Sequence, residues 1–215
     1  MTGTFITFEG PDGAGKTSVL NTLIPKLKAC SVTSVHLTRE PGGAKISETI
    51  RDVILDPKNT AMDARTEALL YAASRRQHLV EVIQPALAHG DIVVCDRFVD
   101  SSVAYQGGGR QIGTQAVLQM NQFATAGLEP DLTVYLDVPV QVGLDRIMAH
   151  QGERQYDRLD QESLAFYERV HAAYMKLVAD NPKRIVTVDA TQPLAAVVTA
   201  AFMTITERFP ELFAK

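Results

Sequence analysis

The chain has 215 residues, of which 46% are hydrophobic and 21% are charged, a balance typical of a globular protein with one sizeable core. Its formal net charge is -4 and its sequence pI is about 5.7, which excludes a basic field for binding nucleic acid or an anionic membrane. We see neither a leader segment nor a run of about 18 apolar residues, so we expect a cytoplasmic protein with no membrane anchor.

Strand and helix patterns alternate along the whole chain. Short runs rich in β-branched residues predict buried strands at 5–8, 32–37, 92–95, 132–136 and 184–188. Helical spacing predicts helices over 16–29, from about 45, and over about 62–88, where Pro85 is expected to bend or end the helix. This alternation predicts a three-layer α/β fold, with one parallel sheet between two helical layers, in a single domain over residues 1–215.

A glycine-rich loop follows the first predicted strand. It matches the pattern G-x-x-x-x-G-K-[ST] through the residues Gly10, Pro11, Asp12, Gly13, Ala14, Gly15, Lys16 and Thr17. In such a loop backbone N–H groups face inward, the helix N-terminus adds partial positive charge, and the lysine reaches the outer phosphates of a nucleoside triphosphate. We therefore assign the loop to ATP phosphate binding and Thr17 to Mg²⁺. Ser18 either extends this phosphate site or lies on an ordinary helix face.

A phosphate loop identifies the donor and leaves the rest of the function open. Kinases, GTPases, motor ATPases and partitioning proteins all carry one. No Asn-Lys-x-Asp motif for reading guanine follows a strand here, and a chain of 215 residues is small for a large oligomeric ATPase. A small-molecule phosphotransferase is therefore favoured, and a nucleotide-dependent switch or partitioning ATPase is the alternative from a different class.

Polar residues that suit an acceptor follow the second strand and occupy the next helices. Glu40 lies within 38–43, just after that strand, and ligands bind at this edge of parallel sheets. The alternative is a surface loop with a chance ion pair. Arg51 lies on a helical pattern, where it either binds a phosphate or is solvated. Tyr71 and Arg75 are four residues apart, so a base can stack on the ring and accept from the guanidinium. The alternative is a core tyrosine beside an arginine that reaches water.

Two charged residues come directly after the third strand. Asp96 and Arg97 follow an apolar run that ends in Cys95, one of only two cysteines, which we expect to be a small buried hydrophobe. Charges in this position are costly unless they are paired or used. Asp96 is therefore assigned to the Mg²⁺ site and Arg97 to a phosphate, with a structural ion pair between the two as the alternative.

A polar, glycine-containing segment at about 148–158 separates two helical patterns and is predicted to be a lid. Arg146, Arg154 and Arg158 surround it. Phosphoryl transfer gains from a guanidinium that arrives only when a site closes, although solvated arginines on helices are equally common. Each of the three is thus a candidate for a catalytic arginine.

Taken together, these motifs resemble the thymidylate kinase family. The matching segments are FEGPDGAGKT, TREPGG, LLYAASR, DRFVDSSVAYQGGGR and DRLDQES, in this order over most of the chain. The resemblance implies phosphoryl transfer from ATP to dTMP with Mg²⁺, a five-stranded parallel sheet with a short lid, and a homodimer. Another small nucleoside or nucleotide kinase is the alternative within the same class.

The resemblance implies roles around the transferred phosphate. Asp12 would lie near the sugar 3′-hydroxyl and the metal, while Arg51 and Arg97 would clamp the dTMP phosphate. Glu40 and Asp96 would organise these arginines or the hydrated Mg²⁺. The implied catalytic set is Asp12, Lys16, Arg97 and a lid arginine.

The resemblance also implies roles around the base and the sugar. Tyr71 would stack on thymine, and Arg75 would donate to its carbonyl. Ser102 and Gln106 would contact the base, and Tyr105 would crowd the 2′ position and disfavour ribonucleotides.

Two positions depart from the family pattern. Tyr71 stands where phenylalanine is more frequent, so its hydroxyl needs a partner or water. Gly13 stands where one branch of the family carries its catalytic arginine, so the lid must supply that group. Arg154 is the first choice, and Arg146 and Arg158 are the alternates.

Overall fold

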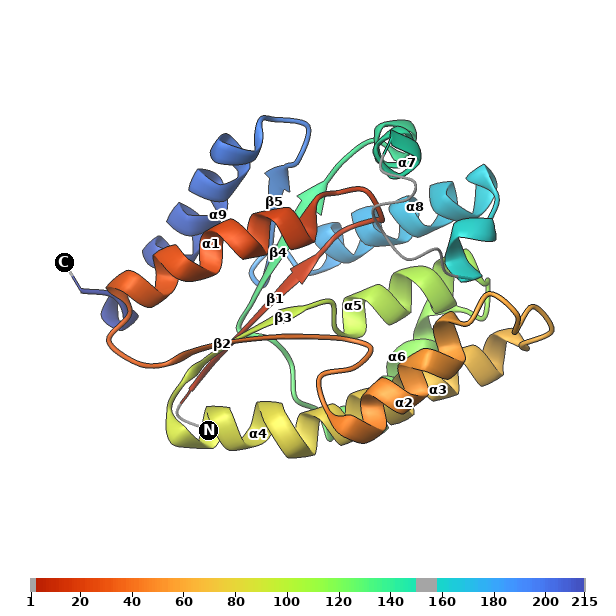
Figure 1. The fold of residues 1–215 in the computed structure, drawn as a ribbon, viewed down its shortest axis with the longest axis horizontal. Coiled ribbons are helices and arrows are strands. Elements are labelled where there is room, and N and C mark those ends of the chain that lie inside the picture. The colour runs from red at the N-terminus through yellow and green to blue at the C-terminus, as the bar shows by residue number, and fades with distance from the viewer. Residues whose placement is uncertain (1–2, 150–157, 215) are drawn as a thin grey trace.

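The computed structural model describes residues 3–149 and 158–214, which build a five-stranded sheet. The strands are β1 (Thr4–Glu9), β2 (Val35–Arg39), β3 (Ile92–Asp96), β4 (Leu132–Asp137) and β5 (Ile185–Asp189). They are all parallel and lie in the order β2-β3-β1-β4-β5. Figure 1 shows helices on both sides of this sheet, so the predicted three-layer α/β fold is confirmed.

Helices form the two outer layers (Figure 1). α1 (Lys16–Cys30) and α9 (Leu194–Arg208) pack together over one face of the sheet. The other face carries α3 (Ala64–His78), the π-helical turn η1 (Leu79–Ile83), α4 (Gln84–His89), α6 (Thr114–Thr125) and α8 (Leu164–Asp180). The remaining elements are α2 (Lys45–Leu55), α5 (Val99–Ser102), the π-helical η2 (Val103–Gly109), α7 (Val140–Ala149), and the 3₁₀ turns η3 (Arg158–Gln161) and η4 (Pro210–Leu212). Within the described ranges, no helix combines the length and apolar character that crossing a membrane requires.

Side chains of the central strands alternate between separate cores on the two faces. Along β1, Ile6 and Phe8 belong to the core beneath α1 and α9, whereas Phe5 packs with Leu79 and Ile83 on the opposite side. Because both faces are covered, the inner strands read as nearly continuous apolar runs in the sequence. β1 and β3 are thus packed on both faces, and the loops that follow them start from buried strand ends.

The second strand differs from its prediction. It begins at Val35 instead of at position 32, and only Val35 is buried along its length. The segment before it is held elsewhere, since the Val32 amide donates to the Leu212 carbonyl at 2.9 Å and Ser31 forms an isolated bridge with Phe213. The prediction of a buried strand over 32–37 is wrong because β2 is an edge strand, and β-branched composition does not distinguish edge strands from central ones.

The helix predicted over about 62–88 continues through Pro85 without ending there. α3, η1 and α4 follow one another directly, and Gly90 closes the run with a φ of 93°. The π-helical turn η1 lies just before Pro85, which occupies the first turn of α4, where the missing proline N–H costs little. A local change of helical hydrogen bonding thus accommodates the proline that was expected to bend or end the helix.

Candidate active site

The carboxyl ends of the strands surround a cavity of about 660 Å³, as expected for a parallel sheet. Its wall contains most of the residues that the sequence singled out: Asp12, Gly13, Ala14, Gly15, Lys16, Thr17, Ser18, Glu40, Arg51, Tyr71, Arg75, Asp96, Arg97, Ser102, Tyr105, Gln106 and Arg146. Arg158 does not contribute to this wall. Arg154 falls outside the described residues.

The phosphate loop joins β1 to α1 through a tightly curled backbone. Gly13 and Gly15 adopt φ angles of 78° and 82°, in the left-handed region that glycine reaches without strain. The amide of Ala14 donates to the carbonyl of Pro11 at 3.2 Å and closes the turn. α1 starts at Lys16, and the residues of its first turn line the cavity. The N–H groups of that turn have no acceptor within the helix and are available to an anion there.

The ammonium group of Lys16 lies across this loop. Its Nζ donates to the carbonyl oxygens of Gly10 and Pro11, at 3.0 Å and 3.1 Å, and the residue is only 7% exposed. Burial, and after it the charge of Arg97, lower the pKa of Lys16 to about 8. The loop therefore offers an anion both backbone N–H groups and a poorly hydrated cation.

Asp12, Arg97 and Tyr105 form one cluster at the mouth of the loop. Arg97 donates to Asp12 Oδ1 at 2.6 Å, and the Tyr105 hydroxyl donates to Asp12 Oδ2 at 2.9 Å. The same hydroxyl accepts from the Asp12 amide at 3.0 Å, and the Arg97 guanidinium lies 5.0 Å from the centre of the Tyr105 ring. Arg97 has a φ of 68°, which is uncommon outside glycine. Its ion-pair partner is Asp12, so the alternative pairing with Asp96 is not the one observed.

Glu9 is a buried residue of this region that sequence reasoning missed. It ends β1, is 1% exposed, and accepts from the Phe98 amide at 2.7 Å and from the hydroxyls of Ser101 and Tyr174 at 2.5 Å and 2.9 Å. Burial, and then the charge of Asp100, raise the pKa of Glu9 above its ordinary value. Its signal was a charged residue directly after a buried strand, the same signal that identified Asp96.

Asp96 and Thr17 are suited to hold a divalent cation. Asp96 ends β3 beside Lys16, and its Oδ1 is buried without a hydrogen-bond donor among the described residues. A buried carboxylate oxygen without a partner is costly unless a cation or donor reaches it. Thr17 lines the same cavity, and carboxylate and hydroxyl oxygens are ligands that suit Mg²⁺. The residues present therefore fit a Mg²⁺ ion.

Arg75 is a fixed part of the wall and does not reach out to water. It is 2% exposed, and it donates to Glu40 Oε2 at 2.6 Å, to Ser102 Oγ at 3.1 Å, to the Phe98 carbonyl at 2.9 Å, and to Asn121 Oδ1. Described residues thus take four of the five N–H donors of a guanidinium. The geometry leaves one donor to point at a ligand, in a direction that the other four determine.

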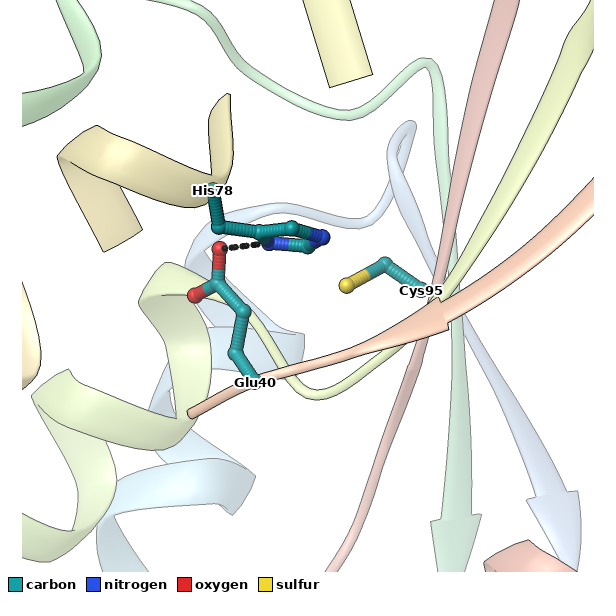
Figure 2. A group of neighbouring side chains, drawn as sticks. All are labelled: Glu40, His78 and Cys95. Atoms are coloured by element: carbon teal, nitrogen blue, oxygen red, sulfur yellow. Dashed lines mark hydrogen bonds and ion pairs between the residues drawn. The ribbon is translucent and has the colours of Figure 1, made fainter. Parts of the chain in front are cut away.

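The carboxylate that holds Arg75 belongs to a buried group with His78 and Cys95. Figure 2 shows the three side chains converging from the end of β2, from α3 and from β3, with ligand-type atoms within 4.8 Å of one another. Both Glu40 oxygens are engaged, one by Arg75 and one by His78 Nδ1 at 3.0 Å, and His78 Nε2 lies 2.6 Å from Thr38 Oγ1. A metal ion here would displace these bonds beside a guanidinium, so we interpret the group as a hydrogen-bond network that orients Arg75.

Three further predicted residues lie around the cavity. Tyr71 is half-buried on α3, and Arg51 on α2 donates to the Pro41 carbonyl at 2.9 Å. Arg146 on α7 donates to the carbonyls of Gly13 at 3.3 Å and Ala190 at 3.0 Å, so it bridges the phosphate loop and the turn after β5. These positions put Arg146 on the side of the phosphate loop and Tyr71 with Arg51 on the opposite wall.

Arg158 does not lie where a catalytic arginine of the lid was predicted. It is buried, donates to the Ile54 carbonyl at 3.0 Å, and forms an ion pair with Glu67 at the start of α3. Because both contacts hold its guanidinium outside the cavity wall, the structure does not bring Arg158 to the phosphate loop.

Known proteins resemble this chain over nearly its whole length. A family model described as Thymidylate kinase matches residues 8–201. The chain is 83% identical to the thymidylate kinase of Lacticaseibacillus casei (strain BL23) over 213 residues, which cover 99% of this chain and all of that protein. It is 62% identical to the thymidylate kinase of Latilactobacillus sakei subsp. sakei (strain 23K), over 99% of both chains. It is 57% identical to that of Enterococcus faecalis (strain ATCC 700802 / V583), over 99% of this chain and all of that protein.

Proposed function

The chain belongs to the thymidylate kinase family, and on that premise we propose that its cavity transfers the γ-phosphoryl group of ATP to dTMP, giving ADP and dTDP for dTTP synthesis. One observation carries the proposal: a phosphate loop and a wall containing Tyr71, Arg51 and Arg75 enclose the same cavity. The loop suits the phosphates of a donor nucleotide, and the wall suits the base and phosphate of an acceptor.

ATP binds along the loop and α7. Its β- and γ-phosphates meet the N–H groups at the start of α1 and the ammonium of Lys16, which then exchanges carbonyl partners for phosphate oxygens. The base end lies toward Arg146 and the turn after β5, where Ala190 and Gln192 line the cavity. The contacts of Arg146 with the carbonyls of Gly13 and Ala190 support this placement, because they join the phosphate loop to that turn.

dTMP binds against the opposite wall. Tyr71 stacks on thymine, and the remaining N–H of Arg75 donates to a thymine carbonyl. Arg51 and Arg97 receive the 5′-phosphate, which lies between the base wall and the phosphate loop. Tyr105 closes the space beside the sugar, because Asp12 and Arg97 hold its ring in place.

Catalysis rests on position and charge. The dTMP phosphate is already an oxyanion, so no general base is needed, and Lys16 and Arg97 stabilise the charge on the transferring group. Asp12 holds Arg97 through an ion pair of 2.6 Å. In the proposed binding mode Asp12 also meets the sugar 3′-hydroxyl. Thr17 and Asp96 would hold Mg²⁺, which when bound neutralises charge on the β- and γ-phosphates.

The arginine that completes the site stays a prediction. Arg154 remains the first choice and lies, with most of the lid at about 148–158, outside the described residues. Of the alternates, Arg146 is part of the cavity wall, whereas Arg158 is engaged by Glu67. This supports a donor-side role for Arg146 and a structural role for Arg158.

The functional unit is a homodimer that packs through its helices. α3 and α6 lie side by side, and Leu69, Val80 and Phe123 expose large apolar side chains along α3, η1 and α6. Phe123 is 91% exposed, and exposing a large apolar side chain to water does not stabilise an isolated protein. A second copy of the chain covers this surface.

The proposed reaction is tested by measuring ADP release with ATP and each of dTMP, dUMP, dCMP and dGMP, and in buffer without a monophosphate. We expect release to depend on a monophosphate and to be fastest with dTMP. Lys16→Ala should reduce turnover by at least about 100-fold while the thermal transition is retained. ADP release at the same rate with every monophosphate and with none would instead identify a nucleotide-dependent switch, and the kinase proposal would be abandoned.

A further inference from the structure

Glu67 is a buried carboxylate that the reaction described above does not use. It lies in the first turn of α3, one turn before Tyr71, and is 0% exposed. Its oxygens accept from Gln106 Nε2 at 2.8 Å, from Arg110 Nε at 3.1 Å and 3.2 Å, and from Arg158. A single acceptor thus joins the base wall of the cavity to two arginines behind it.

This carboxylate stays ionised. Burial by itself would raise the pKa of Glu67, but Arg110, Gln106 and Arg158 outweigh burial and hold that pKa below its ordinary value. An ionised carboxylate can only accept hydrogen bonds. Whatever faces Glu67 must therefore donate.

That requirement determines which way the Gln106 side-chain amide points. An amide has a donor end and an acceptor end of nearly equal size, and only the NH₂ end can face Glu67. Gln106 is 2% exposed and lines the cavity, and none of the described residues donates to its Oε1. The carbonyl oxygen is consequently the end that is left for a ligand.

The resulting wall has a defined pattern of donors and acceptors. Arg75 supplies a donor, because four of its five N–H groups are already committed to the protein, and Gln106 supplies an acceptor. Thymine offers the complement, a carbonyl oxygen at position 4 and an N–H at position 3. Cytosine offers the reverse, an amino group at position 4 and an unprotonated nitrogen at position 3.

We infer that Glu67 is a positioning residue for base selection, which orients the Gln106 amide so that its carbonyl oxygen accepts from N3–H of a thymine-type base. The inference rests on the proposed function and extends it to the choice between pyrimidines. Glu67 does not touch the nucleotide. It acts by making the flipped amide, which would suit cytosine at position 3, unfavourable.

The test compares kcat/KM for dTMP and for dCMP in wild-type protein, Glu67→Gln, Gln106→Ala and the double variant. Glu67→Gln replaces the obligate acceptor with an amide that can donate as well, so the Gln106 amide can turn either way. We expect the preference for dTMP to fall at least about tenfold, mainly through the KM for dTMP, and the double variant to lose no more than Gln106→Ala alone.

Two further variants separate positioning from structural support. Arg110→Met removes one ion-pair partner and leaves the Glu67–Gln106 contact, so it should lower the melting temperature and keep the preference within about twofold. Glu67→Asp retains a carboxylate that the long side chains of Arg110 and Arg158 can still reach. Because its side chain is one methylene shorter, its oxygen lies farther from the Gln106 amide. This variant should lose the preference even if Glu67→Gln fails to fold.

Three outcomes would overturn the inference. The first is a folded Glu67→Gln or Glu67→Asp variant that prefers dTMP over dCMP as strongly as wild type does. The second is a double variant whose loss of preference is the product of the losses in the two single variants. The third is an Arg110→Met variant that loses as much preference as the Glu67 variants do. Wild-type protein that shows no dTMP-dependent ADP release would overturn the proposed function together with this inference. Wild-type protein that prefers dTMP while the Glu67 variants do so equally would overturn the inference alone.

Discussion

Lys16 is a buried lysine whose only hydrogen-bond partners among the described residues are two loop carbonyls. Desolvation makes such an ammonium easy to deprotonate, and it also makes its charge more effective toward a phosphate than that of a hydrated lysine. The same burial therefore favours anion binding and sets a limit on the pH range in which it operates.

The first prediction concerns this pH range. Because the pKa of Lys16 is lowered to about 8, the free protein should lose the ammonium charge as the pH rises through that value. kcat/KM for ATP reports the free enzyme, so it should fall above about pH 8 and approach a tenfold loss per pH unit. The profile is measured between pH 6.5 and 9.5, roughly, with dTMP saturating.

Lys16→Arg is the control for this pH profile, since a guanidinium stays charged throughout that range. Its activity should be lower because the shape of the cation differs, and its alkaline limb should be absent. An unchanged limb in Lys16→Arg would show that another group titrates.

The second prediction separates the two contributions of Tyr105. Its hydroxyl makes two hydrogen bonds with Asp12, and its ring lies against the Arg97 guanidinium. In the proposed binding mode the ring also lies beside the sugar. Tyr105→Phe should lower turnover of dTMP by about tenfold, because Asp12, which pairs with Arg97, loses its hydrogen bonds with the hydroxyl. The variant should retain the selection against ribonucleotides, since the ring remains. Tyr105→Ala should lose that selection. The measurement is kcat/KM for dTMP and for its ribose counterpart, and equal selection in Tyr105→Ala and wild type would refute the steric role.

At the scale of elements, the phosphate loop and α7 meet backbone to backbone. A side chain at Gly13 would collide with the backbone of Gly143, and a Cβ at Gly143 would lie 2.7 Å from the Asp12 carbonyl oxygen. This approach explains why position 13 cannot carry an arginine in this chain without displacement of α7. It also couples the position of α7, and hence Arg146, to the shape of the loop.

The third prediction follows from this approach. Gly143 lies within α7, where alanine is intrinsically favoured by about 1 kcal/mol, so a gain in stability would be expected from propensity alone. The contact with Asp12 should reverse this, and Gly143→Ala should raise the KM for ATP several-fold as the loop is displaced. Gln141→Ala, at an exposed site of the same helix, is the control and should leave the KM unchanged. If the KM for ATP in Gly143→Ala equals that of wild type, the phosphate loop can accommodate the added methyl group without weaker ATP binding, and the prediction is wrong.

At the scale of the whole molecule, the cavity and the exposed apolar surface lie on different parts of the fold. The cavity is built by loops at the carboxyl ends of the strands, whereas Leu69, Val80 and Phe123 belong to the outer layer of helices. Each chain of a dimer therefore carries the proposed site residues of its own cavity. Association should affect stability more than chemistry.

The fourth prediction tests the dimer. Phe123→Glu places a charge within the proposed contact and should convert the protein to a monomer, with a lower melting temperature and the same nucleotide preference. Mass is measured by light scattering after size-exclusion chromatography. Met203→Glu, at a half-exposed position on α9, is the control and should remain dimeric. A monomeric wild-type protein, or a dimeric Phe123→Glu variant, would contradict the proposal.

Much of the site could be predicted from the sequence because its signals are local. A phosphate loop is a contiguous motif, and Asp96 and Arg97 are recognisable because charged residues follow a buried strand directly. Strand and helix periodicity is local as well, which is why the parallel sheet with helices on both faces was predicted and is confirmed. These features require only neighbours in the chain and the ordinary costs of burying charge and backbone.

Tertiary structure decided everything that depends on which distant groups meet. The sequence did not distinguish β2 as an edge strand, did not identify Glu9, and did not separate Arg158, held by Glu67, from an arginine that faces the cavity. The direction of the last N–H of Arg75 depends on four partners from three separate segments: Glu40, Phe98 with Ser102, and Asn121. A sequence motif determines which chemical groups are available, whereas desolvation and pairing across the fold determine which of them remain to bind a ligand.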